Sequence, residues 1–416
     1  MNAFDLALLG LNEANNRVTL RILSIWLALC LSIMAQTPEQ AAAAGPNAHA
    51  WEMFQLFRQM TKGNFCFSPF SGHRVAAMLA EGAQGETQRQ IIGLAHLATE
   101  KDKRTSEAEA IRQELAAGAA RGGMILEVAN SIWAPPAVTL VPDYVTWVEK
   151  RFGASVKTLP PTDAVGCASK VNQWIREKTR GRITDLVGPS VFQAGDGAVL
   201  LVNSIYLKSV WSNPFDPRAT KPRAFTTASG SRTMLPMMVQ QNGFAYADTA
   251  AWQCLDMPFG VGDFSMTLLL PKVESDRTSA EGGLNPETWA KVLTSLGRDE
   301  VSVMLPRFSF STQVNLQGLW QAFGVSDAFD QSKADLGGMI LQKPCWVNQV
   351  LQEATIEVNE LGAKASAATA VADPFGPAEA KPKLRVNVFI ANRPFLWLIR
   401  HQRTGLILFM GRFAGE

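Results

Sequence analysis

The chain has 416 residues, of which 47% are hydrophobic and 18% charged, and its net charge is only +2. A disordered chain would be poorer in apolar residues and carry more net charge. The sequence has no long basic run of the kind that binds nucleic acid and no acidic tail. We therefore expect a folded protein with a sizeable core, built as two average domains or one large one, and no nucleic-acid partner.

The N-terminus contains an apolar run of 14 residues, 22–35 (ILSIWLALCLSIMA), preceded by Arg17 and Arg21. A membrane-spanning helix needs roughly 20 apolar residues. A basic start, a short apolar stretch and a small residue at the cut are typical of a secretory signal. Residues 1–35 are therefore predicted to be a signal peptide ending at Ala35, with an uncleaved anchor or a core helix as alternatives. Residues 36–46 are predicted to be a linker, and the protein to be secreted or periplasmic, without membrane contact once the signal is removed.

The rest of the chain, 47–416, shows mixed periodicity and no second linker, which predicts one domain. Apolar spacing predicts helices at 51–60, 168–179 and 314–323. A helix start followed by an apolar face predicts one at 74–81, and charges of alternating sign predict a solvated helix at 101–115. Apolar runs rich in β-formers predict strands at 125–133, 198–207, 264–270, 301–305 and 354–358, and a hairpin of 395–399 with 406–410. Helices gather early and strands late, which favours the α+β class with large mixed or antiparallel sheets.

Motifs of enzymes and metal proteins are missing from the sequence. There is no HExxH, GxSxG, GxGxxG, Walker loop or CxxC, so neither catalysis nor a metal or cofactor is predicted. One of the four histidines, His401, lies in a polar break (LIRHQRTG) and is expected in a loop. Four cysteines follow the apolar N-terminus, and they are interpreted as free or half-buried thiols, with one disulfide as the alternative: Cys66, Cys167, Cys254 and Cys345.

One segment cannot contribute to a core. Residues 362–372 (GAKASAATAVA) carry almost only small side chains, between a strand and the loop sequence DPFGP at 373–377. A flexible surface linker is the simple interpretation. Alternatively, the segment changes state, because small side chains can slip between two strands and the insertion of a loop into a sheet releases stored strain.

Five motifs, in order along the chain, resemble those of the serpin family. They are NFCFSPFS (64–71), the Asn172, Trp174 and Thr179 to Ile183 pattern, NSIYLKSVW (203–211) with Phe215, EVNELG (357–362) and FIANRPFLWLI (389–399). The chain is similar to serpins from about residue 47 to its end.

The resemblance implies a serpin fold with three β-sheets, about nine helices and an exposed reactive-centre loop. It implies a monomer that is not an enzyme and that needs no cofactor. A serine or cysteine protease would cut the loop and be trapped as a covalent acyl-enzyme when the freed segment inserts into the main sheet. The alternative is a non-inhibitory serpin-fold binding or structural protein whose loop is only cleaved.

The family's hinge carries over residue by residue. Glu360 begins the hinge, Gly362 lets the backbone turn and Ala363 enters the sheet first. Lys364 alternates outward on insertion. The small run that favours an inhibitor continues through Ala365, Ser366, Ala367, Ala368 and Thr369.

The scissile bond is less well defined by the resemblance. The family's spacing of 17 residues from Glu360 gives Gly376-Pro377, and one residue earlier gives Phe375-Gly376, which suits a chymotrypsin-like enzyme. We favour Phe375, then Gly376. Because the loop is long, Lys381 or Lys383 is the trypsin-like alternative.

The resemblance also implies a region where the main sheet opens. Ser68, Ser71 and Asn203 are expected beneath the sheet, and Trp211 at the end where the hinge enters. Gln352 stands where the family often has a histidine, and its amide can still form hydrogen bonds.

Overall fold

The computed structural model describes residues 37–161, 163–179, 181, 183–193, 197–272, 277–342, 344–363 and 386–415. The α-helices of this part are α2 (Pro38–Met60), α3 (Pro69–Gly82), α4 (Gly85–Leu94), α5 (Lys101–Gly122), α6 (Pro142–Phe152), α7 (Ala164–Lys178), α8 (Arg277–Gly282), α9 (Pro286–Ser295) and α10 (Leu316–Ala322). The strands are β1 (Phe65–Phe67), β2 (Ile125–Ala134), β3 (Ser155–Thr158), β4 (Ala198–Val210), β5 (Lys221–Thr226), β6 (Arg232–Asp248), β7 (Trp252–Phe259), β8 (Phe264–Pro271), β9 (Gly297–Pro306), β10 (Phe308–Asn315), β11 (Trp346–Asn359), β12 (Gly362–Ala363), β13 (Asn387–Ile390), β14 (Phe395–His401) and β15 (Ile407–Phe413).

The strands hydrogen-bond into two groups. A six-stranded sheet has the order β10-β11-β12-β4-β2-β3, and β11 also pairs with β4. A nine-stranded sheet has the order β1-β15-β14-β8-β7-β6-β9-β13, with β5 paired to β6. The long strand β6 joins two parts of this second sheet, because its start pairs with β5 and its end with β7. The described strands thus form two sheets, where the resemblance implied three. The α+β class with about nine helices is confirmed.

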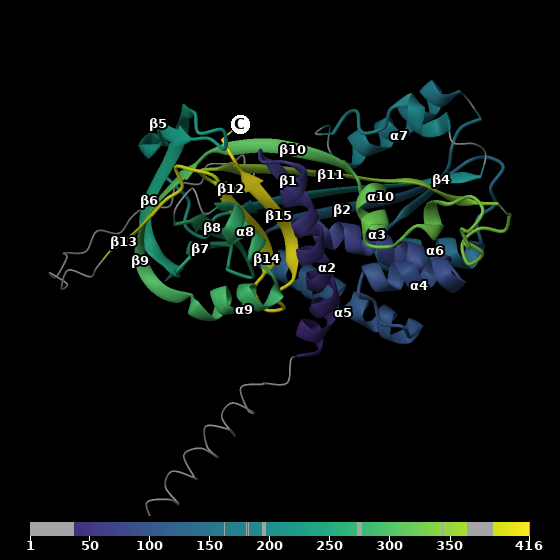
Figure 1. Ribbon diagram of the computed structural model, residues 1–416, viewed down its shortest axis with the longest axis horizontal. Helices are drawn as coiled ribbons and strands as arrows, with labels where there is room; N and C mark the ends of the chain where they lie inside the picture. Colours follow the sequence, from purple (N-terminus) through teal and green to yellow (C-terminus); the bar gives the residue numbers. More distant parts are fainter. Residues whose placement is uncertain are drawn as a thin grey trace, which may run out of the picture.

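Helices cover both faces of the six-stranded sheet. Figure 1 shows α7 on one face and α3, α4 and α6 on the other. Strand β4 is buried along nearly its whole length, because it lies inside this covered sheet. Its continuous apolar sequence is what a strand buried on both faces requires. On the α7 side, Trp174 and Ile175 of the helix belong to the same apolar cluster as Leu200 and Val202 of the strand.

The linker predicted at residues 36–46 is wrong. From Pro38 onward this segment is the first half of α2, which begins at a capping box between Thr37 and Gln40. Alanine has the highest helix propensity, and Ala42 and Ala43 are buried against the core. The helix passes so close to a neighbouring loop that a side chain at Gly45 would lie 2.6 Å from the carbonyl oxygen of His96.

Two buried histidines link α2 to α3. The Nδ1 atom of His49 lies 3.1 Å from the carbonyl oxygen of Leu94, and its ring meets that of His73 edge to face at 6.1 Å. Burial lowers the pKa of His49 to about 4 and that of His73 to about 3. Both imidazoles are therefore neutral in the folded protein at neutral pH.

We expect these histidines to make the folded state sensitive to acid. Their folded-state pKa values lie below the usual value of about 6.5, so the unfolded chain binds more protons between about pH 4 and 6.5. The contribution of each neutral histidine to the free energy of unfolding should be complete above pH 6.5. On acidification below that pH, this free energy should fall by about 1.4 kcal/mol per pH unit for each histidine. Urea unfolding from pH 4.5 to 8 should show a shallower slope for His49→Gln than for the parent. The half-exposed His96 provides the control, and equal slopes for His49→Gln and His96→Gln would contradict the assignment.

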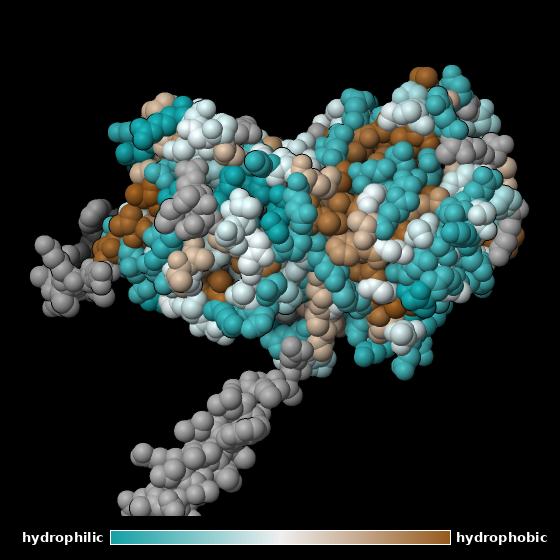
Figure 2. Space-filling view, viewed as in Figure 1, coloured by the Kyte–Doolittle hydropathy of each residue, from teal (hydrophilic) through white to brown (hydrophobic). Residues whose placement is uncertain are grey.

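The hydrophilic outer surface has two apolar areas in the view of Figure 2. Apolar atoms gather in the hollow between α7 and α10, and at the edge beside β13. Val386 and Val388 are exposed at that edge. None of the described helices is long and apolar enough to cross a membrane. His401, expected in a loop, is instead the buried last residue of β14, with Nδ1 2.9 Å from Thr404 Oγ1.

Candidate functional site: the hinge at the open end of the six-stranded sheet

The central strands of the six-stranded sheet separate at one end. Strands β11 and β4 pair directly and in parallel from Trp346 opposite Ala198 up to Ala354 opposite Ile205. Beyond that pair, the two residues of β12 lie between them and run antiparallel to both. The chain therefore leaves β11, turns back and enters the gap beside the strand it has just left.

The turn that enters the gap requires glycine. Asn359 Oδ1 accepts hydrogen bonds from the backbone N–H groups of Leu361 and Gly362, at 3.0 and 3.3 Å. Gly362 has φ +144°, and a side chain there would lie 2.3 Å from the carbonyl oxygen of Ser209. Only glycine adopts this conformation with the backbone so close. The expected turn at Gly362 is thus present in the backbone.

Glu360 anchors the turn. Its buried carboxylate accepts hydrogen bonds from Thr220 Oγ1, at 2.7 Å, and from Arg307 Nη2. Its backbone carbonyl accepts one from the N–H of Phe215 at 2.8 Å. Burial alone would raise the pKa of Glu360, but the bonds from Arg307 and Thr220 outweigh it, so the pKa lies below its usual value. The carboxylate is therefore ionised at neutral pH and holds the start of the hinge.

Trp211 lies where the hinge enters the sheet. Its indole Nε1 donates a hydrogen bond to the carbonyl oxygen of Asn359 at 3.0 Å. Its backbone N–H donates one to the carbonyl oxygen of Leu361 at 2.8 Å. The ring is buried and stacks on Phe259 with centroids 4.6 Å apart. Core packing and contact with the hinge are combined in this one residue.

A buried polar cluster joins β11 to β4 farther down the sheet. Gln352 and Asn203 are register partners, and Gln352 Nε2 donates to Asn203 Oδ1 at 3.0 Å. Gln352 also exchanges hydrogen bonds with the backbone of Ser68, accepting from its N–H at 3.2 Å and donating to its carbonyl at 3.1 Å. An amide can both donate and accept, so Gln352 bridges the strands and the start of α3 in one neutral group.

Asn203 extends the cluster away from β11. Its Nδ2 donates to Ser71 Oγ and, at 2.7 Å, to Asn130 Oδ1 on β2. Ser68 caps α3, with Oγ accepting from the N–H of Ser71 at 3.1 Å and donating to the carbonyl of Leu408 at 2.7 Å. All these side chains are buried. The residues expected beneath the sheet therefore meet in one network, and separation of β11 from β4 must break it.

Other predicted site residues lie outside the described residues. These are Ala365, Ser366, Ala367, Ala368 and Thr369 of the hinge, the scissile candidates Phe375, Gly376 and Pro377, and Lys381 and Lys383. The predicted signal peptide, 1–35, also lies outside them.

Sequence reasoning missed three residues of the site: Arg307, Thr220 and Asn130. Nothing near Arg307 or Thr220 in the sequence indicates that they meet Glu360. Asn130 could have been found, because it is a polar residue in the middle of the predicted strand 125–133.

The cysteines and acidic groups offer no second chemical site. The four described cysteines are buried thiols that form no disulfide, which confirms the simpler interpretation. Burial raises the pKa of Cys66 and Cys254 to about 12 and that of Cys345 to about 11, so these thiols are poor nucleophiles. Among the described residues, no group of three or more His, Cys, Asp or Glu is placed to hold a metal ion.

A sheet that is open at one end, with a hinge that turns back into the opening, is the feature that defines the class of this protein. Comparison of the chain with known protein families identifies that class. The family described as "Serpin (serine protease inhibitor)" matches residues 44–415. Human Serpin B8 is 32% identical over 358 residues, covering 84% of this chain and 92% of its own. Mouse leukocyte elastase inhibitor A is 31% identical over 384 residues, covering 90% and 99%. The chain belongs to the serpin family.

Solved structures agree with this assignment. The crystal structure of native protease nexin-1 with heparin superimposes with a TM-score of 0.80 at 26% identity, over 91% of this chain and 100% of that one. The family consists mostly of protease inhibitors rather than catalysts, and several relatives of this chain are named as inhibitors.

The relatives correct one expectation. A secreted or periplasmic location was expected from residues 22–35. This expectation is contradicted, because the relatives that match most of the chain, Serpin B8 and the leukocyte elastase inhibitors, point away from a secreted protein.

Proposed function

We propose that this chain is a suicide inhibitor of serine or cysteine endopeptidases, which traps the protease as an acyl-enzyme by inserting its cleaved loop into the six-stranded sheet. The observation that carries the proposal is the position of β12, whose two residues already pair with both β11 and β4. The hinge therefore starts in the geometry that full insertion would continue. The names of the leukocyte elastase inhibitors among the relatives support a protease as the partner.

The register of β12 gives the partners of each residue that follows it. Ala363 pairs with Val358 on β11 and Ser209 on β4, and both of these are buried. On insertion in this register, each later hinge residue would pair one position lower on both strands. Ala365 would then lie opposite the buried Ile356 and Leu207, and Ala367 opposite the buried Ala354 and Ile205. Small side chains at these alternate positions are what a strand entering a packed sheet needs.

Two stages of insertion follow from this register. On insertion, residues 364–366 would lie opposite 355–357 of β11, which do not pair directly with β4. Ala367 is the first residue that must displace a direct pair, that between Ala354 and Ile205. Ala368 would next displace the pair between Glu353 and Ser204. Thr369 would then enter between Gln352 and Asn203, replacing their hydrogen bond while offering a hydroxyl that can bond to both.

The length of the sheet favours Phe375 as the residue that carries the acyl bond. Phe375 is twelve residues after Ala363, and the residue twelve positions before Val358 is Trp346, where β11 begins. Insertion through Phe375 therefore matches the length of β11, to within the one-residue bulge between Val347 and Gln349. Lys381 and Lys383 would lie beyond the end of β11. Cleavage there would leave several residues between the inserted strand and the acyl bond that do not pair with the sheet.

A denaturing gel tests the proposal directly. The protein is incubated with chymotrypsin-, elastase-, trypsin- and papain-type proteases, and the released C-terminal peptide is identified by mass. We expect a denaturant-resistant band near the summed masses with a chymotrypsin- or elastase-type enzyme, and a peptide that begins at Gly376.

If the gel shows cleavage but no denaturant-resistant band, thermal melting of the cleaved protein distinguishes the remaining explanations. A large rise in melting temperature after cleavage would mean that the loop inserts and that the target protease was not among those tried. Cleavage with neither a band nor a rise would overturn the proposal and leave a non-inhibitory serpin whose loop is only cut.

A further inference from the structure

Three of the four histidines of the chain meet where α4 ends, between α2 and α3. His49 of α2 bonds to the carbonyl oxygen of Leu94 through Nδ1, and its ring contacts that of His73 on α3. His96 lies two residues after Leu94 and pairs through Nε2 with Glu52 of α2 at 3.0 Å. We call His49, His73 and His96 the histidine cluster.

His96 is held in a strained conformation by the end of α4. Its φ is +49°, and it is the only non-glycine residue with a positive φ in the part of the chain that the structure describes. The N–H of Leu97 bonds back to the carbonyl oxygen of Ile92 at 3.0 Å, a helix ending that usually has glycine at the position of His96. Such strain costs free energy and is concentrated at functional sites, which directs attention to this cluster.

The basic nitrogen of His49 faces the polar cluster beneath the sheet. A carbonyl oxygen only accepts, so the Nδ1 that meets Leu94 carries the hydrogen and Nε2 keeps its lone pair. A side chain at Gly72 would lie 3.9 Å from this Nε2, 3.7 Å from Nε2 of Gln352 and 3.5 Å from Leu316. Residues of α2, β11 and α10 therefore meet at the bare flank of Gly72.

Gln352 shields His49 from water as long as β11 and β4 stay paired. Both hydrogens of its amide are used, by the carbonyl oxygen of Ser68 and by Oδ1 of Asn203, so it has none to donate to His49 Nε2. The side chain of His49 is buried. When β11 moves away from β4, Gln352 leaves with it, and water can reach Nε2 across the flank of Gly72.

The charges that face the buried rings are positive. Burial lowers the pKa of both His49 and His73; His96 adds to this effect at both rings, and Arg74 adds to it at His73. The nearby carboxylate of Glu52 is bound by His96. The residues of β11 and α10 at the flank are uncharged. The closed sheet thus keeps His49 neutral, whereas a hydrated His49 would bind a proton near the usual histidine pKa of about 6.5.

We propose that His49 is an acid-sensitive latch on the six-stranded sheet, so that acidification favours the separation of β11 from β4 and speeds the entry of a strand between them. A fall in pH favours the state that binds more protons. Only the open sheet gives His49 Nε2 access to water, so the gain is absent at pH 7.5 and grows below about pH 6.5. The inference rests on the proposed function, because loop insertion uses this opening.

Entry of a synthetic peptide tests the latch on the full chain without a protease. The probe has the sequence of residues 365–374 (ASAATAVADP). Samples incubated with it at pH 5 or pH 7.5 are returned to pH 7.5 and melted, because a bound peptide raises the melting temperature. We expect the peptide to enter the parent about tenfold faster at pH 5, since one linked proton changes an equilibrium by up to tenfold per pH unit.

Two histidine variants separate the latch from general acid destabilisation. His49→Gln should lose the acceleration by acid. His401→Gln is the matched control, because His401 is also buried with a lowered pKa but lies on β14 of the other sheet. It should keep the acceleration of the parent, and loss of the acceleration in His401→Gln would overturn the proposal.

A third variant covers the case in which His49→Gln folds poorly. A methyl group at Gly72 would meet its neighbours at ordinary contact distances of 3.5–3.9 Å, so Gly72→Ala should fold and should cover His49 Nε2 when β11 moves. Its acceleration by acid should be much smaller than that of the parent. Acceleration that persists in both His49→Gln and Gly72→Ala would overturn the latch. Equal entry into the parent at both pH values would overturn the latch alone, whereas no entry at either pH would also contradict the proposed insertion.

Discussion

If the chain traps proteases as proposed, replacing Ala365 by arginine should convert it from an inhibitor into a substrate. In the register set by β12, residue 365 enters between Ile356 and Leu207, which are 3% and 6% exposed. An unpaired charge forced into such a position costs several kcal/mol. Each 1.4 kcal/mol added to the insertion barrier slows insertion tenfold. Hydrolysis of the acyl-enzyme should then be faster than loop insertion. The number of inhibitor molecules consumed per protease trapped should rise at least about tenfold.

The neighbouring residue offers a matched control. On insertion in this register, Lys364 would lie opposite Glu357 and Lys208, which are only partly buried, so Lys364→Arg would keep the charge on the outer face. The stoichiometry of inhibition, measured by titrating a fixed amount of protease, should be unchanged in Lys364→Arg. Equal trapping by the parent and Ala365→Arg would refute the register. Equal loss in both variants would show that any change in the hinge disturbs insertion.

The sequence predicted elements well where burial leaves a local pattern. The continuous apolar run of 198–207 predicted a buried strand, and β4 is covered on both faces. The helix predicted at 101–115 continues to Gly122, where Gly123 in a left-handed conformation ends it. The alanine-rich segment 36–46 was misread because small residues are typical of both linkers and helices. Only the packing of Ala42 and Ala43 decides between the two.

The site was predicted in part, and the limit is the pairing of distant segments. The hinge and the polar residues beneath the sheet were identified by resemblance, and the structure brings Ser68, Ser71, Asn203 and Gln352 together. The ion pair between Arg307 and Glu360 joins residues 53 positions apart, and no local periodicity records such a contact. The point where β11 leaves β4 is likewise a property of register between two strands. The pattern of residues within a single segment therefore does not predict where the two strands separate.

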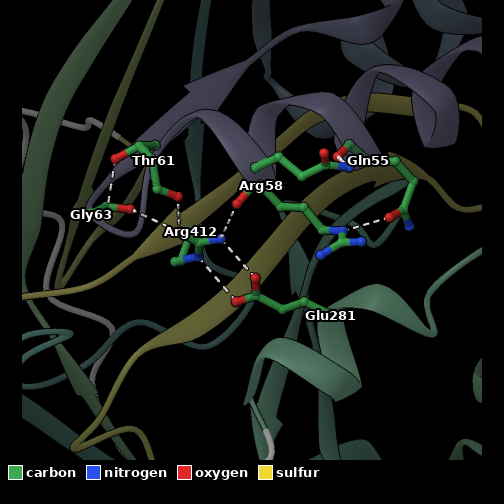
Figure 3. Close-up of polar contacts among 7 residues, drawn as sticks. Gln55, Arg58, Thr61, Gly63, Glu281 and Arg412 are labelled. Atoms are coloured by element: carbon green, nitrogen blue, oxygen red, sulfur yellow. Dashed lines mark hydrogen bonds and ion pairs between the residues drawn. The ribbon is translucent and has the colours of Figure 1, made fainter.

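The second large effect concerns the stability of the folded state. Arg412 of β15 and Glu281 of α8 form a buried ion pair with two hydrogen bonds, Nε to Oε1 at 3.0 Å and Nη2 to Oε2 at 2.7 Å (Figure 3). Nη1 donates to the carbonyl oxygen of Thr61 at 2.7 Å, and the guanidinium lies over the ring of Phe65 at 4.9 Å. The pair thus ties the C-terminal strand to α8 and to the end of α2.

Breaking this pair should be far more harmful than replacing it. Arg412→Met leaves the carboxylate of Glu281, which is 4% exposed, buried without its partner, and removal of one member of such a pair typically costs about 3–5 kcal/mol. The double variant Arg412→Met, Glu281→Leu removes both charges and should recover most of that loss, since apolar replacement of a buried pair is often neutral or stabilising. Urea unfolding of both variants and the parent measures the difference.

An exposed pair on the neighbouring helix gives the baseline. Lys291 and Glu287 of α9 are 70% and 78% exposed and 2.7 Å apart, and Lys291→Met should cause no measurable change. If Arg412→Met unfolds at the same urea concentration as Lys291→Met, the buried pair contributes nothing. If the double variant is as unstable as the single one, the loss comes from the contacts of Arg412 with Thr61 and Phe65. Recovery in the double variant alone identifies the unpaired carboxylate as the cause, because it is the only group that the second substitution removes.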